Sequence, residues 1–377
     1  MRAVKDSGIA WIGEIPQGWD TVRAKYVVAI TNGADPKTEG DTPVYGSGTG
    51  CFKTCGESKE GPAVLLGRKG TVDNPQLVEG KYWNVDTAFD VKTIGNKINL
   101  YYFYLLSQCF DYKYYTATTT LPSMTQTNYG NMYLPFPSLA EQKQIVSYLN
   151  TKCTEIDALI AAKEKTNALL KERRQSMIYE AVTKGLDPTV PMKDSGVEWI
   201  GEIPEGWSTI RAKYVATISN GSDPKTEGDT PVYGSGSESF KTCGEHKEGP
   251  AVLIGRKGAT LHIPHYVEGK YWNVDTSFDV KTDEDMYLLK FYYYASICFD
   301  YKLYISTTTL PSMTQSNYGN MYLPLTSTKE QQEIVDYVEK TLCIIDLLIL
   351  KNDNTLQKLK EYRQSLIYET VTGKVEV

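Results

Sequence analysis

The sequence contains the same long unit twice, and this repeat constrains the fold more than any other feature. The offset between matching residues is 188 up to Gly70 and Gly258, and it becomes 189 from the segment KYWNVDT onward. Solenoid repeats are about 20–50 residues long, so this longer period predicts two copies of a whole structural unit. The clearest matches are residues 5–8 with 193–196 (KDSG), 11–16 with 199–204 (WIGEIP), 41–48 with 229–236 (DTPVYGSG) and 81–87 with 270–276 (KYWNVDT).

Length and composition describe a globular protein of several domains. The chain has 377 residues, of which 41% are hydrophobic and 23% charged, which excludes disorder and fibrous repeats. Its net charge of −6 excludes a non-specific nucleic-acid coat protein, although local basic patches remain compatible with DNA binding. We find no apolar run of membrane-spanning length and no secretory leader, so we expect a cytoplasmic protein without a membrane span. Its seven cysteines are expected to be reduced.

Each copy divides into two parts of different character, which predicts an α+β protein. The first part is rich in Gly, Pro, Thr and Tyr, and its short apolar runs at 26–30, 63–66 and 89–91 are typical of strands. One helix is predicted inside it, over 100–110 and 287–299. The second part has a helical pattern. The predicted boundaries are globular domains at 1–137 and 187–326 and helical spacers at 138–186 and 327–377.

The helical parts have the signature of a coiled coil. A capping box opens each at Ser138 and Ser327, and Gly185 and Gly373 stand where C-terminal caps belong. Apolar residues recur at spacings of three and four over about five heptads. Because one such helix alone would leave its stripe in water, we expect the two to pack as an antiparallel pair. The predicted helix-pairing residues are Ile145, Leu149, Ile156, Leu159, Leu170, Met177, Ile334, Val338, Ile345, Leu348, Leu359 and Leu366.

Several motifs occur in both halves of the chain. They are WIGEIP with Gly18 and Trp19, PVYGS (43–47), LGRKG (66–70), LPSMTQ (121–126) and LPFP (134–137) before the helix start at Glu141. Together they resemble the specificity subunits of type I restriction-modification systems, and the resemblance covers essentially the whole chain. It implies two α/β target-recognition domains separated by two long conserved helices, which form an antiparallel coiled coil with pseudo-two-fold symmetry.

The resemblance also implies a non-catalytic subunit with several partners. Members of this family bind double-stranded DNA at a split site through their two recognition domains. They hold two modification subunits, which transfer a methyl group from S-adenosylmethionine to adenine, and restriction subunits, which complete the cleaving complex. This chain is therefore expected to bind no cofactor itself and to have DNA and both kinds of subunit as partners.

The sequence itself has no motif for catalysis or metal binding. Adenine methyltransferases that flip their base usually carry Asn/Asp-Pro-Pro-aromatic, and the nearest segment here, DNPQ (73–76), lacks the second proline and the aromatic residue. The glycine-rich segments 46–50 and 67–71 lack the order of a phosphate-binding loop. His262 and His265 have metal-like spacing but no counterpart in the first copy, so a plain loop is expected. The segment WNVDT (83–87) is attributed to core packing and turn hydrogen bonds.

Three segments are candidates for DNA contact, and each has a structural alternative. Arg68 and Lys69 stand between glycines, where arginine can read guanine or hold a phosphate; the alternative is a solvated strand end. Residues 45–48 (YGSG) present a ring and a hydroxyl, or they form a structural turn. Residues 118–126 touch DNA with hydroxyl and amide groups, or they pack the domain on its helix. The candidate residues are Tyr45, Ser47, Arg68, Lys69, Thr119, Ser123, Thr125 and Gln126, with Tyr233, Ser235, Arg256, Lys257, Thr308, Ser312, Thr314 and Gln315.

The near identity of the two copies predicts a near-palindromic target. Two similar recognition domains related by a two-fold axis should read nearly the same half-site in inverted orientation, whereas members of this family usually carry dissimilar domains. The copies differ mainly at 49–51 against 237–239 and at 71–77 against 259–266. The half-sites should therefore differ at about one or two base pairs. The alternatives are a scaffold or decoy of the same fold without a DNA target, and a stand-alone nuclease or methyltransferase, which the missing motifs disfavour.

Overall fold

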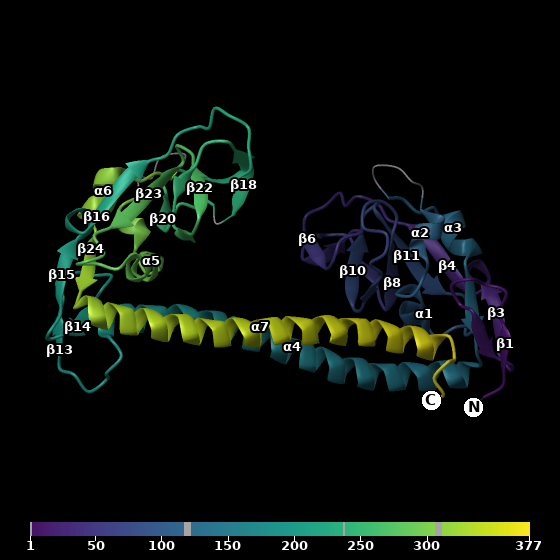
Figure 1. Ribbon diagram of the computed structural model, residues 1–377. Helices are drawn as coiled ribbons and strands as arrows, with labels where there is room; N and C mark the ends of the chain where they lie inside the picture. The colour runs from purple at the N-terminus through teal and green to yellow at the C-terminus, as the bar shows by residue number, and fades with distance from the viewer. Residues whose placement is uncertain (1, 117–121, 237, 306–310) are drawn as a thin grey trace. The chain divides into compact units, whose positions relative to one another are not determined.

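The protein is described here from a computed structural model, which covers residues 2–116, 122–236, 238–305 and 311–377 (Figure 1). The chain forms two compact units. One is built from the two ends of the sequence and the other from its middle. Unit 1 comprises Met1–Glu164 and Asp353–Val377, and unit 2 comprises Lys165–Asn352. Each unit therefore contains one globular domain and parts of both long helices. None of the described helices is long and apolar enough to span a bilayer.

The globular part of unit 1 is a mixture of short strands and short helices, as predicted for an α+β protein. Its helical elements are η1 (Ala24–Tyr26), α1 (Leu100–Ser107), α2 (Tyr112–Tyr115) and α3 (Gln126–Asn131). Its strands are β1 (Val4–Asp6), β2 (Glu14–Pro16), β3 (Asp20–Arg23), β4 (Val28–Asn32), β5 (Thr42–Tyr45), β6 (Cys51–Cys55), β7 (Lys59–Glu60), β8 (Ala63–Gly67), β9 (Gln76–Val78), β10 (Lys81–Asn84), β11 (Ala88–Thr93) and β12 (Tyr133–Phe136).

Unit 2 repeats these elements in the same order. Its helical elements are η2 (Ala212–Tyr214), α5 (Leu289–Ile297), η3 (Tyr301–Leu303) and α6 (Gln315–Asn320). Its strands are β13 (Met192–Asp194), β14 (Glu202–Pro204), β15 (Ser208–Arg211), β16 (Ala216–Asn220), β17 (Thr230–Tyr233), β18 (Ser239–Cys243), β19 (Lys247–Glu248), β20 (Ala251–Gly255), β21 (His265–Val267), β22 (Lys270–Asn273), β23 (Ser277–Thr282) and β24 (Tyr322–Leu325).

Two four-stranded sheets organise each unit. In unit 1 one sheet has the order β4-β11-β8-β9 and the other β6-β5-β10-β7, in which β5 and β10 run parallel. Strand β8 is buried on both faces, because Val64 and Leu66 join the main core while Ala63 and Leu65 pack with Tyr82. The predicted strands at 63–66 and 89–91 are confirmed. The run 26–30 becomes a strand only from Val28, since η1 occupies its first residue.

A buried carboxylate joins the two sheets. Asp90 on β11 accepts hydrogen bonds from Lys59 Nζ at 2.9 Å and from the Tyr82 hydroxyl at 3.0 Å. Lys59 Nζ also donates to Asn84 Oδ1 at 2.7 Å, so β7, β10 and β11 meet at one ammonium group. A buried charge is stable only when it is paired and hydrogen-bonded, and this arrangement meets both conditions. It sets the position of the turn between β10 and β11, which borders the candidate DNA-binding residues.

The long helices are α4 (Leu139–Lys184) and α7 (Thr328–Val371), and their ends follow the sequence signals. Ser138 Oγ accepts from the backbone N–H of Glu141 at 3.3 Å, and the Glu141 carboxylate accepts from the backbone N–H of Ser138 at 3.2 Å. This is the predicted capping box. Gly185 and Gly373 follow the helix ends with φ of 75°, a left-handed conformation that suits glycine.

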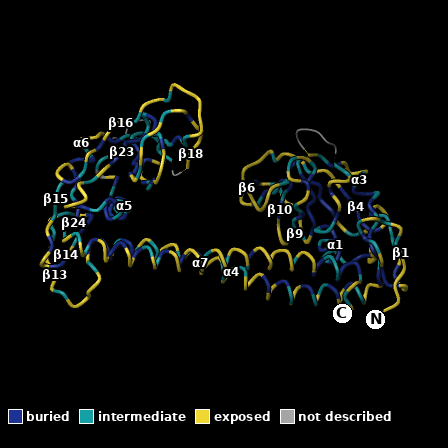
Figure 2. The backbone as a smooth tube through the Cα atoms, in the orientation of Figure 1, coloured by how far each residue is buried: buried dark blue, intermediate teal, exposed yellow. Residues whose placement is uncertain are grey.

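The two helices run antiparallel within each unit. In unit 1, Arg363 Nε of α7 donates to Asp157 Oδ1 of α4 at 2.8 Å. In unit 2, Arg174 of α4 lies 3.6 Å from Asp346 of α7. The buried residues of both helices concentrate near their two ends, where they lie beside the strands of a unit (Figure 2). The predicted antiparallel helix pair is confirmed for each unit.

Each globular domain is completed by the last turns of the helix that belongs to the other sequence copy. In unit 1, Ile367 and Val371 of α7 are buried in one cluster with Ile12 and Trp19. In unit 2, Ile178 and Val182 of α4 are buried with Ile200 and Trp207. Hydrogen bonds repeat this exchange: Tyr368 Oη donates to the Ile12 carbonyl at 3.3 Å, and Tyr179 Oη to the Ile200 carbonyl at 3.0 Å.

Two of the predicted helix-pairing residues are wrong. Leu159 is 54% exposed and Leu348 is 46% exposed. In both helices the next residue, Ile160 or Ile349, packs against the core instead. Neighbouring residues on a helix point about 100° apart, so only one of the two can face the partner helix. The residues that do lie in the two core clusters are Ile145, Leu149, Ile156, Leu170, Met177, Ile334, Val338, Ile345, Leu359 and Leu366.

This burial pattern predicts unequal effects for two substitutions that are one helical turn apart. Ile156→Ala should lower the free energy of unfolding of unit 1 by about 2–4 kcal/mol, because it leaves a cavity in a packed seam. Leu159→Ala should change it by less than about 0.5 kcal/mol, because that side chain is mostly in water. Chemical denaturation of both variants measures the difference, and equal effects would contradict the assignment of the seam.

Candidate nucleic-acid interface

The glycine-flanked cations are held by a short backbone pairing with the segment before α3. The N–H of Gly70 donates to the carbonyl of Pro122 at 2.9 Å, and the N–H of Met124 donates to the carbonyl of Arg68 at 2.9 Å. Lys69 and Ser123 thus form an isolated antiparallel bridge. Unit 2 repeats the pairing, with a bridge between Lys257 and Ser312. Two segments that are more than fifty residues apart in the sequence are therefore side by side.

Glycine is required where this segment leaves the sheet. A Cβ atom on Gly67 would lie 2.2 Å from the carbonyl oxygen of Thr71, and Gly70 has a φ of 83°. No side chain fits the first position, and the second favours glycine sterically. The backbone therefore turns back sharply after β8 and presents the two cations between the glycines at the surface.

An aspartate lies beside the cations in each unit. In unit 1, Arg68 Nη1 lies 3.2 Å from the carbonyl oxygen of Asp86 and 3.8 Å from its carboxylate. In unit 2, Arg256 Nη1 donates to the carbonyl of Asp275 at 3.2 Å, while Lys257 Nζ lies 3.9 Å from the Asp275 carboxylate. The sequence had assigned this stretch to turns and core packing. The role of the two aspartates beside the cations was missed.

The YGSG segment lies against the same turn. The backbone N–H of Ser47 donates to Thr87 Oγ1 at 3.3 Å, and the backbone N–H of Arg68 donates to the Thr87 carbonyl at 2.7 Å. Ser47 Oγ lies 3.5 Å from the place where a Cβ of Gly70 would stand. Tyr45 is half-buried and packs against the cluster under β8. The serine is thus at the candidate surface, while the Tyr45 ring has a largely structural position.

The two segments singled out as differing between the copies are in contact in unit 1. In unit 1, Gln76 Nε2 donates to the Gly46 carbonyl at 2.9 Å and Gln76 Oε1 accepts from the Gly50 N–H at 2.9 Å. Asn74 Nδ2 donates to Thr49 Oγ1 at 3.0 Å. In unit 2 the second of these segments contacts YGSG, which both copies share: Ser235 Oγ lies 3.2 Å from Thr260 Oγ1, and the ring centroids of Tyr233 and His265 are 5.1 Å apart. The sequence differences therefore change one continuous patch of each unit.

The threonines before α3 and α6 have a structural role that the sequence analysis did not assign to them. Thr125 Oγ1 accepts from the backbone N–H of Asn128 at 3.0 Å, and Thr314 Oγ1 accepts from that of Asn317 at 3.1 Å. Each is the N-cap of its helix, a position in which threonine satisfies an otherwise unpaired N–H group. The contact of these hydroxyls with DNA stays a prediction.

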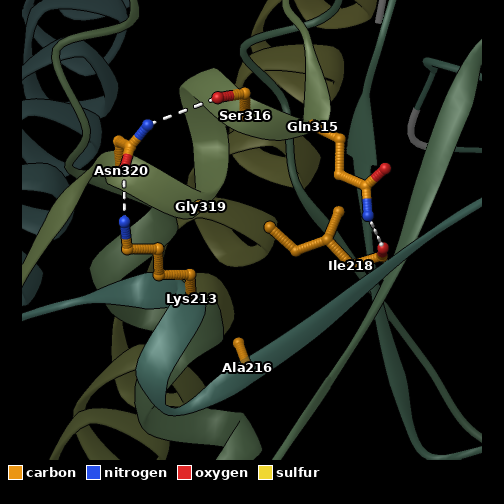
Figure 3. A pocket seen from close by; sticks show the side chains of 7 residues that line it. All are labelled: Lys213, Ala216, Ile218, Gln315, Ser316, Gly319 and Asn320. Atoms are coloured by element: carbon orange, nitrogen blue, oxygen red, sulfur yellow. Dashed lines mark hydrogen bonds between the residues drawn. The ribbon is translucent and has the colours of Figure 1, made fainter.

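The glutamines that follow are tied to the sheet. Gln126 Nε2 donates to the Ile30 carbonyl at 2.6 Å, and Gln315 Nε2 donates to the Ile218 carbonyl. Figure 3 shows Gln315 at the edge of a groove between η2, β16 and α6. In this groove Lys213 Nζ donates to Asn320 Oδ1 at 3.1 Å. These bonds use Nε2 of each glutamine and not Oε1. Contact of the glutamines with DNA bases stays a prediction.

Five of the candidate residues of unit 2 line a shared concavity. It has a volume of about 330 Å³ and is lined by Asn220, Arg256, Lys257, Phe278, Ser312, Met313, Thr314 and Gln315. Tyr233 and Ser235 do not line it, and the candidates Thr119 and Thr308 lie outside the described residues. The structure thus brings together the three segments that the sequence had singled out separately.

The histidines do not form a metal site in the part of the chain that is described. No group of three or more metal-ligating side chains is found there. His262 lies in a turn and His265 begins β21, so only the first of the two matches the predicted loop. Burial lowers the pKa of His265 below its ordinary value of 6.5.

The pKa shift of His265 predicts a pH dependence that is specific to unit 2. Because folding disfavours the charged imidazolium, the stability that depends on neutral His265 is complete above pH 6.5 and is lost as the pH falls from there through the lowered pKa. His265→Gln, which introduces the residue found at Gln76 in unit 1, should remove this dependence. Thermal unfolding between pH 7.5 and about pH 5 measures it. The exposed His262→Gln is the control, and a pH-independent difference between wild type and His265→Gln would contradict the prediction.

Part of the chain matches a known family of DNA specificity domains. Residues 16–171 match the family model of the type I restriction modification DNA specificity domain. The type I restriction enzyme MjaVIII specificity subunit of Methanocaldococcus jannaschii is 34% identical over 159 residues, which cover 42% of this chain and 33% of that protein. The type I restriction enzyme EcoDI specificity subunit of Escherichia coli is 20% identical over 406 residues, with 96% of this chain and 90% of that protein covered.

Solved structures show the same fold. One chain, from work on complex assembly and conformational transition of the type I restriction-modification system, has a TM-score of 0.77 at 16% identity and covers 96% of this chain and 99% of its own. The HsdS subunit from Thermoanaerobacter tengcongensis has a TM-score of 0.54 at 16% identity, with 96% and 98% covered. The predicted α+β fold with two long helices is confirmed. The chain is therefore similar to the specificity subunits of type I restriction-modification systems, in sequence over residues 16–171 and in fold over nearly its whole length.

Proposed function

We propose that the protein binds a bipartite site in double-stranded DNA and that each unit reads one half-site. The observation that carries the proposal is the surface patch on each unit, where Arg68 and Lys69, or Arg256 and Lys257, stand between two glycines beside a serine. Cations with close backbone access can hold phosphates and read guanine in the major groove. With DNA as its target, the protein would act in the cytoplasm.

The geometry of the patch suggests how recognition is divided among its groups. Arg68 is two-thirds buried and is oriented by Asp86, so little side-chain entropy is lost when it meets a base. Arg256 has the same carbonyl contact and also lies 5.9 Å from the Phe278 ring. Lysine is a mobile point charge by comparison, which suits phosphate contacts. The arginines are thus the proposed base readers, and the lysines the proposed phosphate contacts.

The two half-sites are proposed to be nearly the same sequence in inverted orientation. Arg68, Lys69 and Ser47 recur in unit 2 with the same backbone pairing. The segments singled out as differing between the copies lie at the patch in which Gln76 or His265 adjoins the YGSG segment. A change confined to one patch should alter the reading of few base pairs.

The helices are the proposed platform for the other subunits. Large apolar side chains in water mark surfaces that bind proteins. Leu159 on α4 and Ile344, Leu347 and Leu350 on α7 are more than half exposed. We propose two modification subunits, which use S-adenosylmethionine, and restriction subunits as the partners. The specificity-subunit family is generally non-catalytic, and in our proposal the methyl transfer and the cleavage both belong to those partners.

Removing both arginines tests the DNA-binding proposal directly. The double variant Arg68→Ala, Arg256→Ala should weaken specific binding about 30-fold or more, because a good arginine–base contact contributes about 1–3 kcal/mol. Assembly with the modification subunits should be unchanged. Gel-shift titration with and without those subunits measures both properties.

A matched control removes the same charge elsewhere. Lys81→Ala, Lys270→Ala also removes one positive charge from each unit, at the opposite end of β10 and β22 from the candidate patch. It should keep most of the specific affinity. An equal loss of DNA affinity in both double variants would show that the arginines contribute only non-specific charge. An assembled complex without any target preference would favour the scaffold or decoy alternative.

Exchanging the divergent segments tests the near-palindrome. Residues 49–51 and 71–77 of unit 1 would be replaced by the unit 2 segments 237–239 and 259–266. The two patches would then be identical, so the recognised sequence should become a perfect inverted repeat. Sequencing of methylated adenines in cells that carry the variant system measures the change. A recognised sequence that stays the same would contradict the assignment of base reading to these segments.

A further inference from the structure

A bulged phenylalanine projects from the edge of each candidate patch. Strand β6 pairs with β5 so that Lys53 opposes Val44 and Cys51 opposes Tyr45, which leaves Phe52 without a partner. In unit 2 the register shifts at the same place and leaves Phe240 unpaired. A β-bulge adds one residue to a strand and redirects its side chain, and bulges are often found beside functional sites.

Both rings are far more exposed than large apolar side chains usually are. Phe52 is 59% exposed and Phe240 is 60% exposed. Full burial of such a ring would stabilise the fold, and the bulge keeps it in water in both units. Exposed apolar groups that recur at one place indicate contact with a partner.

Each ring stands directly beside the YGSG segment. A Cβ atom on Gly46 or on Gly234 would lie 3.6 Å from the ring of Phe52 or Phe240. The N–H of Ser47 in this segment is bound to Thr87, which also receives the Arg68 backbone N–H. The ring, the serine and the arginine thus border one surface. Residues 49–51 differ between the copies, whereas the phenylalanine and the following lysine are identical.

A cation covers one face of each ring. Lys53 Nζ lies 5.6 Å from the centroid of Phe52, and Lys241 Nζ lies 5.4 Å from that of Phe240. A side chain that wedges between base pairs needs both ring faces free for stacking. A ring with one covered face presents an edge and one open face, which suits contact with an apolar group in the major groove. The apolar group that the major groove offers is the thymine 5-methyl.

We propose that Phe52 and Phe240 each contact the 5-methyl group of a thymine, one in each half-site, and so contribute to base selection. This inference rests on the proposed function, because it assigns the ring a place on the same DNA-reading surface. In this proposal Lys53 and Lys241 each bind the DNA backbone phosphate next to that thymine. The two rings should read the same base in both half-sites, since their surroundings at Gly46 and Gly234 are the same.

Replacing single thymines by deoxyuridine tests the inference, because this removes the methyl group and keeps the base pair. The complete chain with its modification subunits would be titrated with duplexes that carry one replacement each. In each half-site there should be one thymine whose replacement weakens wild-type binding about fourfold, which is the effect of one buried methyl group. In Phe52→Ala, Phe240→Ala that replacement should have no effect, and Phe52→Leu, Phe240→Leu should keep part of it.

The exposed tyrosines of η1 and η2 provide a matched control. Tyr26 and Tyr214 are also exposed and also have a lysine over the ring, but they lie outside the patch. The variant Tyr26→Ala, Tyr214→Ala should keep the full dependence on the methyl group. The inference is overturned if no replacement weakens wild-type binding, if the effect persists in the phenylalanine-to-alanine variant, or if a half-site has no thymine. Loss of all target preference in the wild type would instead refute the proposed function.

Discussion

The architecture depends on the exchange of helix ends between the two sequence copies. The last turns of α7, with Ile367 and Val371, fill the core of unit 1, and the last turns of α4, with Ile178 and Val182, fill that of unit 2. Without them Trp19 and Trp207 would lose the apolar neighbours that bury them. Each indole N–H also donates to the first-turn glutamate of the helix that starts in its own unit, Glu141 or Glu330. Duplication of the sequence thus leads to one interdependent chain rather than two separable domains.

The candidate interface follows from that core through the sheets. Strand β8 is buried on both faces, so the turn after Gly67 can only lead outward to the surface. There the backbone bonds to residues 122–124 hold Arg68 and Lys69 in place, while Thr87 joins them to Ser47. The buried strand β8 and these backbone bonds therefore determine where the cations lie. The segments that differ between the copies lie at its rim, where a substitution changes recognition without disturbing the core.

The large features of this fold could be predicted from the sequence, and the details of the site could not. The repeat and the heptads predicted two units and an antiparallel helix pair, because periodicity reports which face is buried. Periodicity did not separate Leu159 from Ile160, since both suit an apolar stripe. Thr125 was assigned to DNA contact because capping needs a known helix start, and α3 is only one and a half turns long. The exposed position of Phe52 depends on a register shift between two strands, for which the sequence carries no local signal.

The central claim is that two nearly identical units read two nearly identical half-sites. The most direct test is single-molecule sequencing of methylated adenine in a strain that carries this chain with its modification subunits. The account predicts one bipartite motif whose halves are inverted repeats of each other except at about one or two base pairs. A motif with unrelated halves would contradict it.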